Sequence, residues 1–140
     1  MITSAPNVLE NSVSAANVLI QKRKVLIVDD EAELPKLIKV AVSRYDICNE
    51  TDSRRALATA RSFQPDLILL DVMMPHLDGG DVAAQIRSDP LLKSVPIVFF
   101  TALVTAGETN KRPLFGGYPF IAKPLTPQKL AEQIDRHLAG

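Results

Sequence analysis

Cysteine and net charge are both scarce in this sequence of 140 residues. The single cysteine, Cys48, has no second thiol with which to form an internal disulfide, and one unpaired cysteine suits a reducing cytoplasm. The 16 basic residues are balanced by 16 acidic ones, so the chain lacks the broad positive field that attracts nucleic acid or an anionic membrane. We therefore expect a cytoplasmic protein that binds neither nucleic acid nor a membrane by itself.

Long apolar runs and nucleotide-binding glycine loops are also missing. No apolar run reaches the roughly 20 residues that span a bilayer. The positive charges near the amino terminus follow its apolar patch, which is the reverse of the order in a secretory signal. The first apolar run is not followed by a glycine-rich phosphate loop, so a tightly bound nucleotide is not expected.

Length and composition indicate one globular domain. Single domains commonly have about 100–200 residues. Hydrophobic residues make up 46% of the chain, as in ordinary soluble domains. Residues 1–22 are rich in Ser, Ala and Asn, and we expect them to form an extension with little fixed structure or a short docking helix. The folded domain is expected to span residues 23–140.

Short apolar runs alternate with segments of helical spacing through this domain. The predicted strands cover residues 25–28, 45–50, 67–70, 95–100 and 120–122. The predicted helices cover about 34–42, 53–63, 81–88 and 127–138. This alternation predicts an α/β fold in which five parallel strands, joined by right-handed crossovers, form a doubly wound sheet with helices on both faces.

The helical segments carry their own signals. Leu34, Leu37, Ile38, Ala41 and Val42 recur at helical spacing in the first of them. Pro35 is tolerated there if it falls in the first turn.

Thr126 and Pro127 form a typical helix start, with the threonine as N-cap and the proline at the first helical position. Segment 104–118 is broken by glycine and proline, so we expect a short or irregular fourth helix there.

Polar groups follow four of the five predicted strands. Asp29 and Asp30 end the first strand, Asp71 the third, Thr101 the fourth and Lys123 the fifth. Ligands of doubly wound sheets bind beyond the carboxyl ends of the strands, so these side chains are expected to share one site. Each residue taken alone has an ordinary alternative role, such as capping of the first helix by Asp29 or Asp30.

Crowded carboxylates predict a bound cation. Three carboxylates close together repel one another unless a cation neutralises them, and oxygen ligands suit Mg²⁺. An ionised Asp71 is a nucleophile able to form an acyl phosphate, while Lys123 and Thr101 can stabilise charge on the phosphoryl oxygens. The phosphoryl group must then come from another protein or a small phosphodonor.

Four motifs carry a resemblance to a known family. They are VLIVDDE (25–31), LILLDVMMPHLDG (67–79), PIVFFTA (96–102) and FIAKP (120–124). In order and spacing they resemble the response-regulator receiver domains, over about residues 23–140.

The resemblance implies a flavodoxin-like fold and a signalling switch that catalyses its own phosphorylation and dephosphorylation. It also implies that Asp30 and Asp71 bind Mg²⁺ together with the backbone carbonyl of Met73, while Asp29 acts mainly through water. The implied phosphodonor is a histidine kinase or a histidine phosphotransfer protein, and a downstream protein is the implied target. The Lys123-Pro124 bond is expected to be cis.

One departure and two alternatives accompany this prediction. Phe120 stands where the family often has tyrosine, so the aromatic switch is expected in altered form. One alternative is a pseudo-receiver that binds partners without phosphate turnover. The other is an aspartyl-nucleophile phosphatase, which would need a second acid at position 73, where the chain has Met73. We expect no effector domain within the chain, although a piece of a longer regulator would have the same sequence.

Overall fold

A six-stranded sheet forms the centre of the molecule. The computed structural model describes residues 22–102, 114–115 and 117–139. Five strands are parallel, in the order β2-β1-β3-β4-β6, and the two-residue strand β5 (Leu114–Phe115) pairs antiparallel with β6. The parallel strands are β1 (Arg23–Val28), β2 (Tyr45–Glu50), β3 (Leu67–Leu70), β4 (Ile97–Thr101) and β6 (Tyr118–Ala122). The predicted doubly wound parallel sheet is confirmed.

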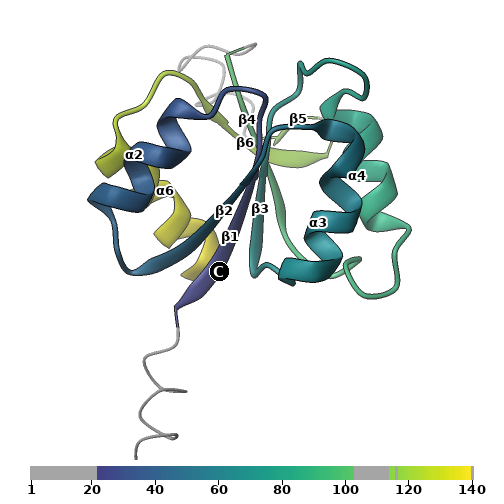
Figure 1. Cartoon of the computed structure of the whole chain (residues 1–140), viewed down its shortest axis with the longest axis horizontal. Helices are drawn as coiled ribbons and strands as arrows, with labels where there is room; N and C mark the ends of the chain where they lie inside the picture. The colour runs from purple at the N-terminus through teal and green to yellow at the C-terminus, as the bar shows by residue number, and fades with distance from the viewer. Residues whose placement is uncertain (1–21, 103–113, 116, 140) are drawn as a thin grey trace, which may run out of the picture.

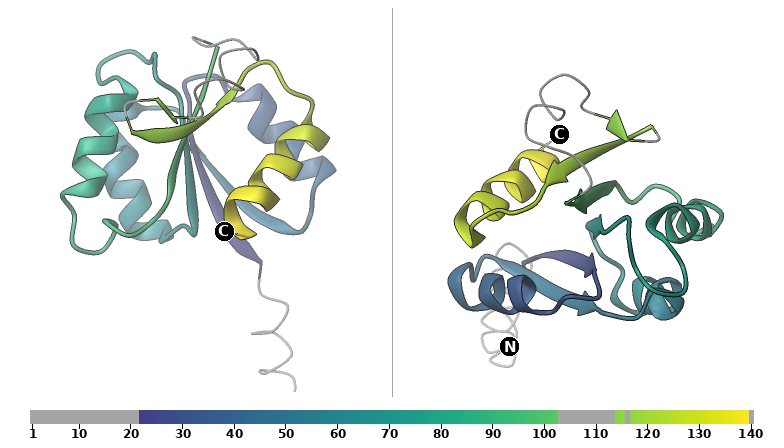
Figure 2. Two further views of the ribbon diagram at one scale, coloured as in Figure 1. Left: turned by 180° about the vertical axis from the view of Figure 1, so that it is seen from behind. Right: turned by 90° about the horizontal axis from the view of Figure 1, so that it is seen from above.

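Two helices cover each face of the sheet (Figures 1 and 2). One face is covered by α2 (Glu33–Ala41) and α6 (Pro127–Ala139), and the other by α3 (Ala56–Phe63) and α4 (Gly79–Arg87). A 3-10 helix, η1 (Ser53–Arg55), leads directly into α3. Within the described ranges no helix combines the length and the apolar character needed to cross a membrane.

The continuous apolar runs of the strands follow from this layered arrangement. Val25 and Ile27 pack into the core beneath α2 and α6, whereas Leu26 and Val28 pack into the core beneath α3 and α4. Successive side chains of a strand point to opposite faces, so a strand covered on both faces needs apolar residues at every position. The run Leu67–Leu70 is fully buried for the same reason.

Several predicted boundaries shift by a few residues. The predicted helix 53–63 is η1 followed by α3, α4 begins two residues before Asp81, and β6 begins two residues before Phe120. In α2, Ile38 and Val42 are buried but Leu37 is 54% exposed, because it lies at the border of the apolar stripe. The predicted irregular helix at 104–118 and the extension at 1–22 lie almost wholly outside the described residues.

The predicted helix starts are confirmed. Thr126 Oγ accepts a hydrogen bond from the backbone N–H of Lys129 at 3.1 Å, and Pro127 is the first residue of α6. Pro35 is buried in the first turn of α2.

The loop that joins β3 to α4 (the β3–α4 loop, residues 71–78) ends in a strong cap. Asp78 Oδ1 accepts from the N–H of Asp81 at 2.9 Å, and the Asp81 carboxylate accepts in turn from the N–H of Asp78, which completes a capping box. Gly79 does not take a positive φ, and the left-handed residue of this region is His76, with φ 75°. Gly79 is required instead by close packing, because a Cβ there would lie 2.5 Å from the carbonyl oxygen of Asp71.

Replacing Gly79 by alanine is therefore expected to destabilise the protein by about 1–3 kcal/mol, the usual cost of overpacking. The added methyl would also meet Val72 Cα at 2.9 Å and the Phe99 ring at 3.0 Å. Chemical denaturation measures the loss. Gly80→Ala is the matched control: its nearest contact is Asp78 Oδ1 at 3.3 Å, and it should change the free energy of unfolding by less than about 1 kcal/mol. Equal losses in the two variants would contradict this account.

Candidate phosphoacceptor site

Strand register brings the polar strand ends together. Val28 of β1 pairs with Leu70 of β3, so the next residues, Asp29 and Asp71, emerge side by side. The N–H of Asp71 donates to the carbonyl of Val28 at 2.9 Å and fixes this alignment. In the sheet, β1 lies between β2 and β3, so the connection that leaves β1 runs to one side and the next connection crosses to the other. Asp29 and Asp71 flank this point of reversal, where doubly wound sheets bind ligands.

Three carboxylates form an acidic cluster at this point. Asp29, Asp30 and Asp71 each offer one oxygen, and these oxygens all lie within 4.8 Å of one another. Asp29 and Asp71 are buried, at 2% and 8% exposure, while Asp30 faces solvent. The alternative in which Asp29 or Asp30 caps the first helix is wrong, because the N-cap of α2 is Ala32 and has no side-chain cap. Asp29 Oδ1 instead accepts from the N–H of Glu31 at 3.0 Å.

Lys123 places its ammonium against the acidic cluster. Its Nζ donates a short hydrogen bond to Asp29 Oδ2, lies 3.5 Å from Asp71 Oδ2, and sits 5.0 Å from the centre of the Phe100 ring. Burial alone would lower the pKa of Lys123, but the hydrogen bond to Asp29 and the nearby negative charges outweigh burial and raise it. The lysine is therefore fully charged at neutral pH. The predicted cis bond between Lys123 and Pro124 is present.

Thr101 lies on β4, the strand next to β3, and Phe120 lies on β6, the strand next to β4. Thr101 ends β4 and is 1% exposed, and its carbonyl accepts from the N–H of Lys123 at 2.9 Å. Phe120 on β6 pairs with Phe99 on β4 and is buried in the core beneath α3 and α4. The predicted switch aromatic thus lies inside the molecule in this structure.

Met73 lies on the β3–α4 loop, and its side chain is 64% exposed. The base of the loop is closed by a hydrogen bond from the N–H of Gly79 to the carbonyl of Val72 at 2.8 Å. A backbone carbonyl at position 73 thus belongs to a loop that is fixed where it leaves β3.

Sequence reasoning missed two buried polar residues, Ser53 and Glu50, that hydrogen-bond to neighbouring segments. Ser53, 1% exposed, donates from Oγ to the carbonyl of Pro75 at 2.7 Å and accepts from the N–H of Leu77 at 3.0 Å. Its position at the start of a predicted helix gave no sign of this contact. Glu50 accepts from Thr59 Oγ1 at 2.5 Å and from the N–H of Asp52 at 3.0 Å.

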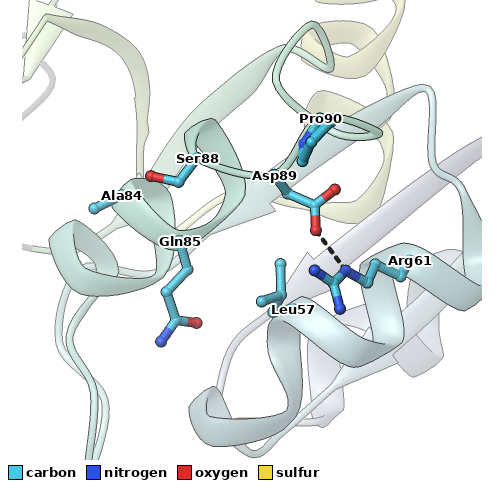
Figure 3. Close-up of a pocket in the computed structure, with 7 residues that line it drawn as sticks. All are labelled: Leu57, Arg61, Ala84, Gln85, Ser88, Asp89 and Pro90. Carbon is cyan, nitrogen blue, oxygen red and sulfur yellow. Dashed lines mark hydrogen bonds and ion pairs between the residues drawn. The ribbon is translucent and has the colours of Figure 1, made fainter.

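Another buried acid, Asp89, lies outside the cluster. Figure 3 shows a hollow between α3 and α4, with Leu57 and Arg61 on the side of α3. Asp89 lines it, but this carboxylate is occupied by an ion pair with Arg61 Nε and a hydrogen bond from the N–H of Leu91. The hollow therefore offers no free carboxylate for chemistry.

Comparisons with known proteins agree with this geometry. The family model of the response regulator receiver domain matches residues 25–135. The chain is 36% identical over 115 residues to a probable transcriptional regulator ycf27 from Guillardia theta, covering 81% of this chain and 44% of the relative. It is 36% identical over 104 residues to the response regulator PleD of Caulobacter vibrioides, covering 73% of this chain and 23% of that protein. The chain thus spans half or less of the length of these curated relatives.

Solved structures show the same fold. A response regulator from Desulfuromonas acetoxidans superimposes with a TM-score of 0.71 at 27% identity, covering 84% of this chain and 97% of the other. The BeF3-activated N-terminal receiver domain of Klebsiella pneumoniae RstA gives a TM-score of 0.67 at 28% identity, covering 84% of this chain and all of the other.

The doubly wound sheet and its solved relatives define a receiver-type, flavodoxin-like α/β domain. The chain belongs to the response regulator receiver domain family.

Removing the charge of Lys123 should lower the free energy of unfolding, because the carboxylates of the acidic cluster lose their cation. Lys123→Met leaves Asp29, whose side chain is 3% exposed, without its cation, and we expect a loss of about 3–5 kcal/mol in the free energy of unfolding without added metal. The pKa of Lys123 is raised above its unfolded value of about 10.4. The difference from wild type should therefore be complete below that pH and shrink only as pH rises through the folded-state pKa.

Urea denaturation from pH 7 to 11 measures this difference. Lys129→Met, on the exposed side of α6, is the control and should change stability by less than about 0.5 kcal/mol. A Lys123 variant as stable as wild type at pH 7 would contradict the role given to the ion pair.

Proposed function

We propose that this chain is a signalling switch that accepts a phosphoryl group on Asp71 from a histidine kinase or a histidine phosphotransfer protein, in a Mg²⁺-dependent reaction in the cytoplasm. The observation that carries the proposal is the convergence of Asp29, Asp30, Asp71 and Lys123 at the ends of β1, β3 and β6. A purely structural role would not need three carboxylates at one point, since their mutual repulsion costs stability.

The donor set fits a hard divalent cation. Asp30 and Asp71 would hold Mg²⁺ together with the backbone carbonyl of Met73, and Asp29 would act mainly through water. All are oxygen ligands, and the exposure of Asp30 leaves room for the several waters that Mg²⁺ retains. When bound, the metal supplies charge stabilisation for the phosphoryl oxygens.

The residues of the chain perform the transfer. A carboxylate oxygen of Asp71 forms the new bond to phosphorus while the phosphorus–nitrogen bond of the donor phosphohistidine breaks, and the bonding electrons return to the donor imidazole. Lys123, already beside Asp29 and Asp71, neutralises charge on the transferring oxygens. The Thr101 hydroxyl donates a hydrogen bond to one of those oxygens.

Phosphorylation then changes the local charge and biases two existing states of the domain. The phosphoryl group adds close to two negative charges and three acceptor oxygens. Thr101 is drawn toward it, and Phe120 on the adjacent strand fills the space that Thr101 leaves. Phe120 has no hydroxyl to hydrogen-bond at the surface, so the state is signalled by packing alone to a downstream protein. The size of the shift is limited by how much more favourably the phosphoryl group interacts with one state than with the other.

Asp71→Asn tests the proposal directly. Incubation of wild type with acetyl phosphate and Mg²⁺ should add the mass of one phosphoryl group, and the variant should gain none, because an amide cannot form the acyl phosphate. Intact-mass spectrometry gives the result. Asp78→Asn is the matched control, since asparagine is also a good N-cap and position 78 lies outside the acidic cluster; it should be phosphorylated like wild type.

Two other outcomes separate the alternatives. The pseudo-receiver alternative would be supported if the wild-type protein takes up no phosphate. Its fluorescence spectrum should then also stay unchanged on titration with beryllofluoride and Mg²⁺. Phosphate uptake that persists in Asp71→Asn would show that the acceptor is another residue.

A further inference from the structure

A serine outside the acidic cluster, Ser53, hydrogen-bonds to the β3–α4 loop on both sides of His76, the residue at the tip of the loop. Ser53 Oγ donates to the carbonyl of Pro75 at 2.7 Å and accepts from the N–H of Leu77 at 3.0 Å. The residue is 1% exposed, so water does not compete for these bonds. The N–H of Leu77 also approaches the carbonyl of Pro75 at 3.0 Å, which makes a tight turn around His76. The hydroxyl thus closes the turn at which the backbone takes its left-handed residue.

Ser53 is itself fixed from two directions. Asp52 caps η1 by accepting from the N–H of Arg54 at 3.0 Å, and the carbonyl of Ser53 accepts from the N–H of Ala56 at the other end of η1. Glu50, 9% exposed, accepts from the N–H of Asp52 and from Thr59 Oγ1, so it joins the end of β2 to both η1 and α3. The hydroxyl of Ser53 therefore extends from a rigid support to the loop.

The loop is consequently held at two points, with Met73 between them. At its base the N–H of Gly79 bonds to the carbonyl of Val72 at 2.8 Å, and at its tip Ser53 bonds to Pro75 and Leu77. Val72, Met73, Met74, Pro75 and Asp78 line a surface hollow, so side-chain packing alone does not fill the loop region. The exposed side chain of Met73 contributes little that would fix its own backbone.

We infer that Ser53 is a positioning residue for the Mg²⁺ site, which holds the backbone carbonyl of Met73 in place by restraining the loop at Pro75 and Leu77. The inference rests on the proposed function, because it concerns the metal that the acidic cluster would bind. Mg²⁺ accepts only near-ideal octahedral geometry, so a carbonyl ligand on an unrestrained loop loses affinity. Ser53 touches neither metal nor phosphate and acts only through the backbone of the loop.

Ser53→Ala provides the test. It removes both hydrogen bonds and leaves Pro75 and Leu77 without this partner. We expect the Mg²⁺ dissociation constant, from isothermal titration calorimetry on the full chain, to rise about tenfold. The rate of phosphorylation by acetyl phosphate should fall at low Mg²⁺ and recover at saturating Mg²⁺. Ser53→Thr, which keeps the hydroxyl, should restore most of the affinity.

A control variant separates positioning from general destabilisation. Asp89→Asn weakens the ion pair between the buried Asp89 and the exposed Arg61 at the opposite end of the sheet, so it lowers stability without touching the loop. Its Mg²⁺ affinity should equal that of wild type, even where its thermal midpoint falls as much as that of Ser53→Ala. In the metal-free protein, amide hydrogen exchange at Leu77 should be faster in Ser53→Ala than in wild type. In Asp89→Asn it should match wild type.

The possible failures are distinguishable. If wild type binds Mg²⁺ and Ser53→Ala binds it equally well, or if Asp89→Asn loses as much affinity, the inference is overturned while the proposed function stands. If wild type itself binds no Mg²⁺ and gains no phosphate, the proposed function fails and the inference fails with it.

Discussion

The ammonium of Lys123 is the contact on which the arrangement of the site depends. Three carboxylates converge beyond β1 and β3, two of them almost fully buried, and Lys123 is the cation that the structure pairs with them. The lysine follows β6, and β4 lies between β6 and β3 in the sheet. Its side chain therefore crosses the end of β4, over the Phe100 ring, to reach Asp29. The ion pair ties together the ends of strands that are distant in sequence, so the site forms only when the whole sheet has formed.

The strands and the charged residues at their ends were predictable, because both depend on simple rules. A strand buried on both faces must be apolar at every position, as Leu67–Leu70 is, and a polar residue directly after such a run must lie at the edge of the sheet. Parallel strands present that edge together, which is why Asp29, Asp71 and Lys123 could be placed in one site from their positions alone. The family motifs added the expectation that Met73 is a metal ligand and the cis bond at Pro124, which the spacing of residues does not supply.

What could not be predicted depends on contacts between loops. Ser53 reaches Pro75 and Leu77, more than 20 residues away, and no periodic pattern encodes such a contact. The constraint on Gly79 is the carbonyl of Asp71, which approaches only because the loop folds back onto β3. Leu37 fits the helical spacing of α2 and is still half exposed. Helical spacing predicts which residues share a face of the helix, but it does not predict how far the neighbouring helix and the sheet cover that face.

The charge balance of the site explains why the loop matters as much as the acids. Three carboxylates and one ammonium leave two negative charges uncompensated, and the proposed phosphoryl group replaces one carboxylate charge by nearly two, a net gain of about one negative charge. Lys123 is already engaged by Asp29, so it cannot balance this increase by itself. A divalent cation can, but Asp30 is exposed, while Asp29 is occupied by Lys123 and the N–H of Glu31. The proposed carbonyl ligand of Met73 would add a neutral oxygen to these acids, and the β3–α4 loop that carries it has a backbone held at both its base and its tip.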